Sequence, residues 1–349
     1  RGFAAPRQNR AAWTSKPPFL RLTSEGGISV IQYRHYASGD ERQIVAAWNA
    51  ALTKDPITPK RFRNLVLLDG NFDPEGLRLA FDGDELVGCV YAVRRLMPMS
   101  GSDLEPDNGW IPFFFVVPSH QRRGIGRTLM SQALEFLQEK GRKQVFFASY
   151  APNYILPGID INAYPGGRAF LEAMGFAKLY AAVAMDRSLV GFVIPPDVEE
   201  LRREREAEGY TFAHATDSDL VELIRFANEK FNPDWGRAIR EGVVQGLPLE
   251  RILVARDSGR LVGFCMYGAY EGVPERFGPF GVDPDQRGKG LGKILLNLCL
   301  RDMRSEGLHG AWFLWTGETT PAGYLYKRTG FAVTREFYVM KKVLSQGEE

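Results

Sequence analysis

The chain has 349 residues, of which 44% are apolar and 25% charged, a composition typical of a globular protein with room for two domains. Its formal net charge of only +2 gives no support to nucleic-acid binding, and no run of 18 apolar residues predicts a membrane-spanning helix. The three cysteines lie far apart in apolar runs, which predicts buried free thiols in a reducing compartment, the cytoplasm.

The first 27 residues are predicted to be a basic tail outside the folded domains. Residues 1–24 carry five basic side chains and no acidic one. Transit peptides share this bias, but the segment is not clearly amphipathic. A cloning remnant or a flexible tail is therefore an equally good interpretation.

The next segments predict a mixed fold in chain order. Residues 28–36 alternate like a strand, and 39–52 have helical spacing after an acidic turn. An apolar hairpin follows, and 111–117 reads as a buried central strand, of which 113–117 is smooth and apolar. The segment 124–141 is an amphipathic helix that ends at a glycine, and a strand, a short helix and a final strand pair complete the unit.

The second half of the chain repeats this order. Three segments recur in the same sequence, marked by the pairs Gly88 and Gly263, Gly124 and Gly290, and Gly175 and Gly330. We therefore predict an α+β (mixed α/β) protein of two tandem units, each a mixed, mostly antiparallel sheet flanked by helices. The predicted boundaries are 28–190 and 210–349, joined by a linker with a surface helix at 191–209.

Two glycine-rich loops carry the clearest chemical signal. QRRGIGR (121–127, the first cradle) and RGKGLGK (287–293, the second cradle) each follow an apolar strand and open a long helix. Glycines at a helix start let an anion approach the free backbone N–H groups. Neither loop has the Walker pattern, and both follow the fourth or fifth strand and not the first, which disfavours a Rossmann site.

The pattern Gln/Arg-x-x-Gly-x-Gly in this setting resembles the acetyl-coenzyme A motif of the GNAT N-acetyltransferase superfamily. VVP at 116–118, VDP at 282–284 and Tyr-x-x-x-Gly-Phe at 326–331 are also typical of that family. The resemblance covers about 28–190 and 210–344. The two-unit layout is similar to that of the mycothiol synthase family, a likeness of architecture and not of substrate.

The resemblance implies that both cradles and the strand before each bind acetyl-CoA. The residues assigned to the cofactor in the first unit are Phe114, Phe115, Val116, Gln121, Arg122, Arg123, Gly124, Ile125, Gly126 and Arg127. Those assigned in the second unit are Phe280, Gly281, Val282, Arg287, Gly288, Lys289, Gly290, Leu291, Gly292, Lys293 and Thr319. No metal site is expected.

The two units differ at the position of the expected catalytic acid. In the family a tyrosine four residues before the Gly of Gly-Phe often protonates the leaving thiolate. Tyr326 holds this position in the second unit, whereas Leu171, which cannot donate a proton, holds it in the first. A packed aromatic residue is the alternative interpretation of Tyr326, and Tyr324 is the nearby competitor.

The sequence singles out no strong general base. The four histidines lie in the first cradle's loop, on outer strands or at the wrong strand end. Glu318 follows the strand end where an acceptor would enter and could act through a water, although a solvated carboxylate is the alternative. Backbone N–H groups around Phe280 to Val282 are candidate oxyanion donors, because Gly278 and Pro279 favour an irregular strand.

The acceptor is predicted only by composition. Aromatic and acidic residues gather in segments that should border the second unit's cleft: Phe231, Trp235, Phe277, Trp312, Trp315, Asp234, Glu271 and Glu275. We therefore predict an acetyl-CoA-dependent N-acetyltransferase for a small amine, active in the second unit, with no nucleic-acid or membrane partner. The alternatives are a non-catalytic CoA-binding protein, or an acyltransferase for a longer acyl chain or a protein amine.

Overall fold

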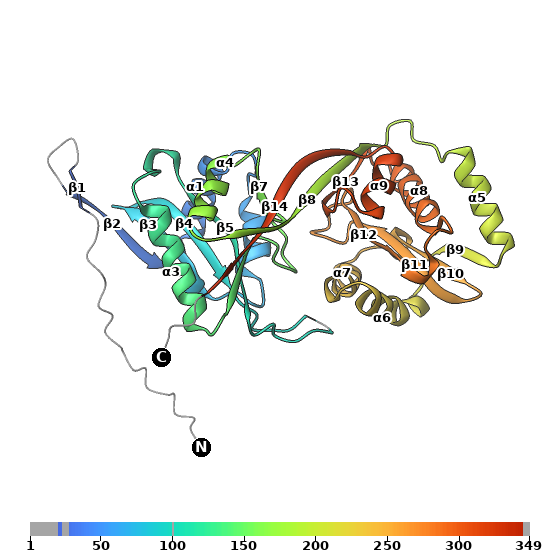
Figure 1. The fold of residues 1–349 in the computed structure, drawn as a ribbon, viewed down its shortest axis with the longest axis horizontal. Helices are drawn as coiled ribbons and strands as arrows, with labels where there is room; N and C mark the ends of the chain where they lie inside the picture. Colours follow the sequence, from blue (N-terminus) through green and yellow to red (C-terminus); the bar gives the residue numbers. More distant parts are fainter. Residues whose placement is uncertain (1–19, 23–27, 100, 345–349) are drawn as a thin grey trace, which may run out of the picture.

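A computed structural model describes residues 20–22, 28–99 and 101–344 of the chain. The tail predicted at 1–27 lies outside these residues, apart from the backbone of the short strand β1 (Leu20–Leu22). The described chain forms two lobes that are connected by two long strands, β8 (Ala177–Ser188) and β14 (Ala332–Val343) (Figure 1).

The first lobe contains the elements of the first predicted unit. They are β2 (Ile28–His35), α1 (Glu41–Ala51), α2 (Pro59–Phe62), β3 (Leu77–Asp82), β4 (Glu85–Val93), β5 (Asn108–Val116), α3 (Ile125–Glu139), β6 (Gln144–Phe147), β7 (Ile159–Asp160) and α4 (Pro165–Ala173). The helix expected at 124–141 is α3, and its buried face carries Leu129, Ala133, Phe136 and Leu137 as the spacing predicts.

The second lobe repeats this order and adds one helix that the sequence analysis missed. Its elements are α5 (Pro196–Ala207), β9 (Tyr210–His214), α6 (Leu220–Lys230), α7 (Pro233–Val244), β10 (Ile252–Asp257), β11 (Arg260–Tyr267), β12 (Phe277–Val282), α8 (Leu291–Ser305), β13 (Gly310–Thr316) and α9 (Pro321–Arg328). The missed helix is α7, which begins with Pro233 after the capping side chain of Asn232.

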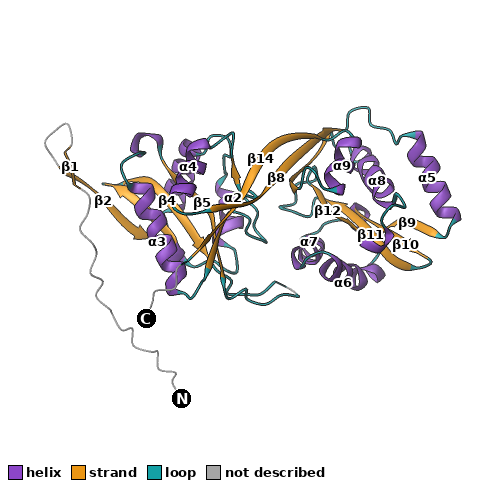
Figure 2. Cartoon of the chain, in the orientation of Figure 1, coloured by secondary structure: helices purple, strands orange, loops and turns teal. Residues whose placement is uncertain are grey.

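Helices flank two sheets, which confirms the predicted α+β class (Figure 2). The larger sheet has the strand order β1-β2-β3-β4-β5-β6-β14-β8-β13, with β7 also paired to β14, and the smaller has the order β12-β11-β10-β9. The side chains of β10 and β11 alternate between two apolar clusters, one containing residues of α8 and the other residues of α6 and α7. No helix among the described residues is long and apolar enough to cross a membrane.

The last strand of each unit is shared between the two lobes. The end of β14 pairs with β6 of the first lobe, from Met340 opposite Phe147 to Val343 opposite Gln144. The end of β8 pairs in turn with β13 of the second lobe, and the two long strands pair with each other along most of their length. The units therefore exchange strands, although the chain order had predicted one sheet for each unit.

The exchange is fixed by packing and by charge. Met340 belongs to the apolar core of the first lobe, and Met185 of β8 belongs to a core of the second. Arg335 of β14 donates 2.7 Å and 2.9 Å hydrogen bonds to both carboxylate oxygens of Asp55 and a 2.7 Å bond to Asp160. These bonds, bidentate at Asp55, join the C-terminal strand to a loop and to strand β7 of the first lobe.

A fragment of residues 28–209 should fail to fold into a stable monomer. It lacks β14, so β6 and β8 lose the strand between them. It also loses Phe337, Val339 and Met340, which are buried and would each contribute about 1.5–3 kcal/mol. We expect gel filtration and NMR to show aggregation or poor dispersion, with recovery when 210–349 is co-expressed. A dispersed, monomeric fragment would contradict the role given to β14.

Candidate active site

The two cradles have the same backbone conformation. Arg122 and Gly124 have φ angles of 63° and 84°, and their repeat equivalents Gly288 and Gly290 have 84° and 77°. Left-handed residues in this arrangement turn successive backbone N–H groups toward one concave site that suits an anion. Each cradle leads directly into a 15-residue helix, α3 or α8, whose N-terminal dipole adds positive potential.

The first cradle is open to solvent. Residues 121–124 are all exposed, and a Cβ built on Gly124 meets no atom within 4 Å. Within the described residues neither Arg122 nor Arg123 has an ion-pair partner, and Gln121 donates a 3.0 Å hydrogen bond to the Val116 carbonyl at the end of β5. The cradle is therefore accessible to a phosphate group.

The second cradle is partly covered by helix α5. A Cβ built on Gly290 would lie 2.6 Å from Cδ2 of Leu201 in that helix. Lys289 donates a 2.6 Å hydrogen bond to the Tyr210 hydroxyl, and Lys293 pairs with Asp197 at 2.5 Å. The predicted linker helix thus lies against this cradle.

Both central strands are irregular next to the cradles. The pairing of β11 with β12 slips between Cys265 and Tyr267, opposite the Gly278–Pro279 segment, as the sequence predicts. The pairing of β4 with β5 also slips, between Tyr91 and Val93. The expectation that only the second unit has an irregular strand was wrong, because Pro112, just before the smooth segment 113–117, interrupts the first.

Beyond these bulges the central strands diverge from their parallel neighbours. Pairing of β5 with β6 ends at Ile111 and Phe147, and β12 contacts β13 through one isolated bridge, between Arg276 and Trp312. A cavity opens at each divergence. The first has a volume of about 550 Å³ and the second about 350 Å³.

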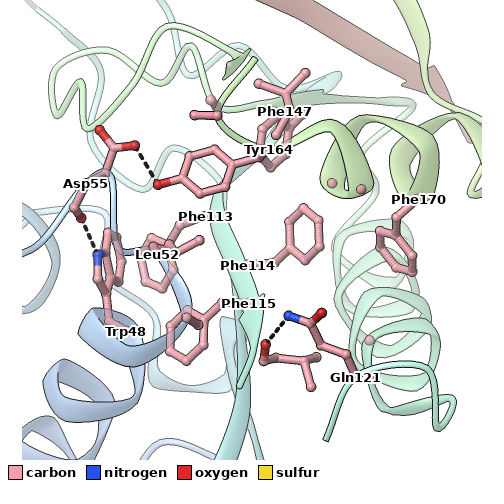
Figure 3. A pocket seen from close by; sticks show the side chains of 18 of the residues that line it. Trp48, Leu52, Asp55, Phe113, Phe114, Phe115, Gln121, Phe147, Tyr164 and Phe170 are labelled. Atoms are coloured by element: carbon pink, nitrogen blue, oxygen red, sulfur yellow. Dashed lines mark hydrogen bonds between the residues drawn. The ribbon is translucent and has the colours of Figure 1, made fainter. Parts of the chain in front are cut away.

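The first cavity reaches from the first cradle to an apolar interior (Figure 3). Phe114 and Phe170 face each other across it with ring centroids 5.1 Å apart. At the other end the Tyr164 hydroxyl donates a 2.8 Å hydrogen bond to Asp55, the partner of Arg335. Leu171 is fully buried and does not line the cavity, so this site has no hydroxyl at the position of Tyr326.

The second cavity is lined by both lobes. Its lining residues are Tyr154, Pro157, Asn232, Asp234, Trp235, Tyr270, Arg276, Phe277, Gly278, Pro279, Phe280, Phe313, Leu314, Trp315 and Tyr326. The predicted residues Asp234, Trp235, Phe277 and Trp315 are among them. Phe231 instead stacks on Trp235 and packs against Gly281, where no side chain could be accommodated.

Tyr326 lies at the inner end of the second cavity. It is only 7% exposed, and its ring packs against Phe313 at a centroid distance of 4.4 Å and against Phe277, Phe280 and Phe331. Burial raises the pKa of the Tyr326 phenol well above its ordinary value. The hydroxyl is protonated at neutral pH, as it would be with an ordinary tyrosine pKa, and the raised pKa makes it a weaker acid than an exposed tyrosine.

Glu318 and Thr319 do not line the second cavity. Both are exposed, and Glu318 accepts a 2.6 Å hydrogen bond from Lys327 of α9. A role for Glu318 as the general base would therefore require a water chain between its carboxylate and the cavity. Tyr324, the competitor of Tyr326, is 51% exposed on another face of the helix.

Tyr154 and Arg276 are among the lining residues of the second cavity that the sequence analysis missed, and it named Asp234 without its partners. Tyr154, from the first lobe, packs edge-on against Trp315 and Tyr270. Arg276 is buried at the base of the divergence. Asp234 accepts hydrogen bonds from Arg237 at 2.9 Å and from the Tyr270 hydroxyl at 3.0 Å. Residues 152–167 are an insertion that makes the first unit longer than its repeat in the second. This insertion was the available signal for Tyr154, because loops inserted into a repeat often border a site.

Comparison with known proteins assigns both units to one class. Residues 44–155 match the model of the acetyltransferase (GNAT) family, and residues 248–333 match that of the acetyltransferase (GNAT) domain. The mycothiol acetyltransferase of Thermobispora bispora is 26% identical over 306 residues, which cover 84% of this chain and 92% of the relative. That of Clavibacter sepedonicus is 30% identical over 306 residues, covering 83% and 88%.

A solved structure shares the fold of both lobes. The GCN5-related glucosamine N-acetyltransferase region of a fungal multi-domain β-N-acetylglucosaminidase superposes with a TM-score of 0.76 at 20% identity. The match covers 90% of this chain and 38% of that longer one. The fold and the two cradles thus define a GNAT-type N-acetyltransferase. More particularly, this chain belongs to the GNAT superfamily as a tandem protein with two GNAT units.

Charge reversal at Arg123, and separately at its equivalent Lys289, should distinguish acetyl-CoA binding at the first cradle from binding at the second. Each loses a cationic partner for the pyrophosphate, so we expect Arg123→Glu and Lys289→Glu each to weaken one acetyl-CoA binding event about ten-fold or more. Isothermal titration calorimetry on the full chain provides the measurement. Lys143→Glu, at the far end of α3, is the control of equal charge change. Unchanged titrations in both variants would exclude both cradles.

Proposed function

We propose that this chain transfers the acetyl group of acetyl-CoA to the amine of a small molecule, with the chemistry in the second cavity. The observation that carries the proposal is the position of Tyr326, a buried phenol in the wall of the second cavity that packs against Phe277 and Phe280 of β12 and Phe313 of β13. The relatives' name makes a mycothiol-related amine one acceptor to assay.

The cavity's groups suit direct transfer. Acetyl-CoA supplies the acetyl group as a thioester; the amine nitrogen forms the C–N bond while the C–S bond breaks. Backbone N–H groups of β12 near Phe280 would bind the developing oxyanion, because the bulge there interrupts regular pairing. The amine loses one proton to solvent or a base, and Tyr326 gives one to the departing sulfur and regains it afterwards.

The first unit is proposed to bind CoA without turnover and to complete the second cavity. Its open cradle and its cavity supply the binding surface. Support for the lack of turnover comes from Leu171, which is fully buried and carries no ionisable group. Tyr154 and Pro157 of this unit line the second cavity, so the first unit contributes to acceptor binding.

Replacing Tyr326 by Phe should lower kcat ten-fold or more, because the variant keeps the ring packing and loses only the proton donor. Acetyl-CoA affinity should stay within two-fold, since the cradles are untouched. The measurement is release of free thiol over a panel of amine acceptors. Tyr324→Phe is the matched control on the same helix, and we expect it to retain the activity of the unaltered chain.

Two results would count against the proposal. Full turnover in the Tyr326→Phe variant would remove this residue from the mechanism. Absence of thiol release with every amine, while acetyl-CoA still binds, would favour the non-catalytic CoA-binding alternative.

A further inference from the structure

Arg276 is a buried cation in the wall of the second cavity that the proposed acetyl transfer does not use. The residue is 5% exposed and immediately precedes β12, at the bridge to Trp312 where the two strands begin to diverge. Its guanidinium lies 4.6 Å from the ring centroid of Tyr270 and 5.5 Å from that of Trp312. These rings hold the guanidinium plane in a fixed orientation.

The charge of Arg276 is only partly compensated. Its Nη1 donates a 3.1 Å hydrogen bond to Glu271, but the same carboxylate is also held by Arg61 at 2.6 Å. One carboxylate thus pairs with two guanidinium groups, so the set of Arg61, Arg276 and Glu271 carries one net positive charge. Burial lowers the pKa of Arg276 from its ordinary value, which reflects the cost of keeping this cation out of water.

The nearby acid Asp234 forms no hydrogen bond or ion pair with Arg276 among the described residues. Asp234 lines the same cavity, but Arg237 donates to its Oδ1 from both Nε, at 3.0 Å, and Nη2, at 2.9 Å. The second carboxylate oxygen accepts from the hydroxyl of Tyr270, the residue whose ring faces Arg276. Asp234 therefore positions Tyr270. It shares Arg237 with Glu241, so one carboxylate charge of this group is left over and offsets part of the charge of Arg276 from a distance.

One edge of the guanidinium is available to a ligand. Of the three guanidinium nitrogens of Arg276, Nη1 is the one with a hydrogen-bond partner among the described residues. The other two, Nε and Nη2, form a parallel pair of donors. Two parallel N–H groups match the two oxygens of a carboxylate. Because Arg276 lines the cavity, this edge can meet a group bound inside it.

We propose that the acceptor of the acetyl group carries a carboxylate that binds Arg276, as in an α-amino acid or a close derivative. This inference rests on the proposed function of the second cavity. Aromatic residues form the remaining walls, among them Trp235, Trp315 and Phe313, so an aromatic or apolar side chain suits the acceptor. The carboxylate at Arg276 would orient the amine toward the Tyr326 end.

Matched acceptor pairs test the proposal. Each amino acid, from glycine to tryptophan, is assayed against its amide, with acetyl-CoA and thiol release as the readout. We expect the acid to exceed its amide in kcat/KM by about ten-fold or more, because the amide offers one acceptor oxygen to the two free donors of Arg276 and leaves one of them buried without a partner. The amine of the amide is the weaker base and is more fully deprotonated, so protonation alone cannot produce this preference.

Variants of Arg276 test whether this residue causes the preference for the acid over its amide. Arg276→Gln should bring the ratio of acid to amide near one through loss of activity on the acid, and Arg276→Lys should restore only part of it, because lysine lacks the bidentate edge. Arg61→Gln removes the other partner of Glu271 without touching the cavity, and we expect it to keep the ratio within two-fold. Thermal unfolding of all three variants reports their folding.

Each outcome has one consequence. Equal use of acids and amides, or turnover only of amines without an acidic group, would overturn the carboxylate proposal and leave the acetyltransferase proposal standing. A loss of acid preference in Arg61→Gln as large as in Arg276→Gln would reduce Arg276 to a structural bridge between the lobes. No thiol release with any amine would refute the proposed function itself. If Arg276→Gln does not fold, the Arg276→Lys ratio decides.

Discussion

The exchange of β8 and β14 is the constraint on which the rest of the structure depends. Each lobe obtains one of its sheet strands from the other, and Arg335 fixes the crossing by binding Asp55 and Asp160. A partly buried bidentate pair is costly to break once formed, because each partner would be left as an unpaired charge. The relative position of the two cavities is therefore set by hydrogen-bonded strands and not by a flexible linker, which allows one cavity to draw side chains from both lobes.

The insertion at 152–167 contributes side chains to both cavities. It supplies Tyr154 and Pro157 to the second cavity, and Ile155, Leu156, Ile159 and Tyr164 to the first. A single loop thus lines both sites, which gives the first unit a role that does not require its own acid. Leu171 gives the first unit no hydroxyl at the position of Tyr326, but this support for the second cavity does not depend on residue 171.

Local patterns predicted the parts of the fold that depend on neighbouring residues. The cradles, the helices α3 and α8, the hairpins and the bulge at Gly278 follow from glycine positions and hydrophobic spacing within short windows. The strand exchange could not be predicted, because β14 has the same alternating pattern whichever sheet it joins. Arg276 escaped notice for a related reason: a charged residue before a strand is usually solvated, and only the fold shows it buried.

The two cradles share one backbone conformation but differ in how open they are to a phosphate group. In the second, Lys289 and Lys293 hold Tyr210 and Asp197, and α5 lies over Gly290. These contacts involve a neutral hydroxyl and an exposed carboxylate, both weaker partners for a lysine than a doubly anionic pyrophosphate. The lysines therefore have more to gain from the phosphate than they lose by releasing their present partners. Partial cover of the second cradle by α5 is thus compatible with phosphate binding there. The contact with Asp197 of α5 holds the Lys293 side chain near the site.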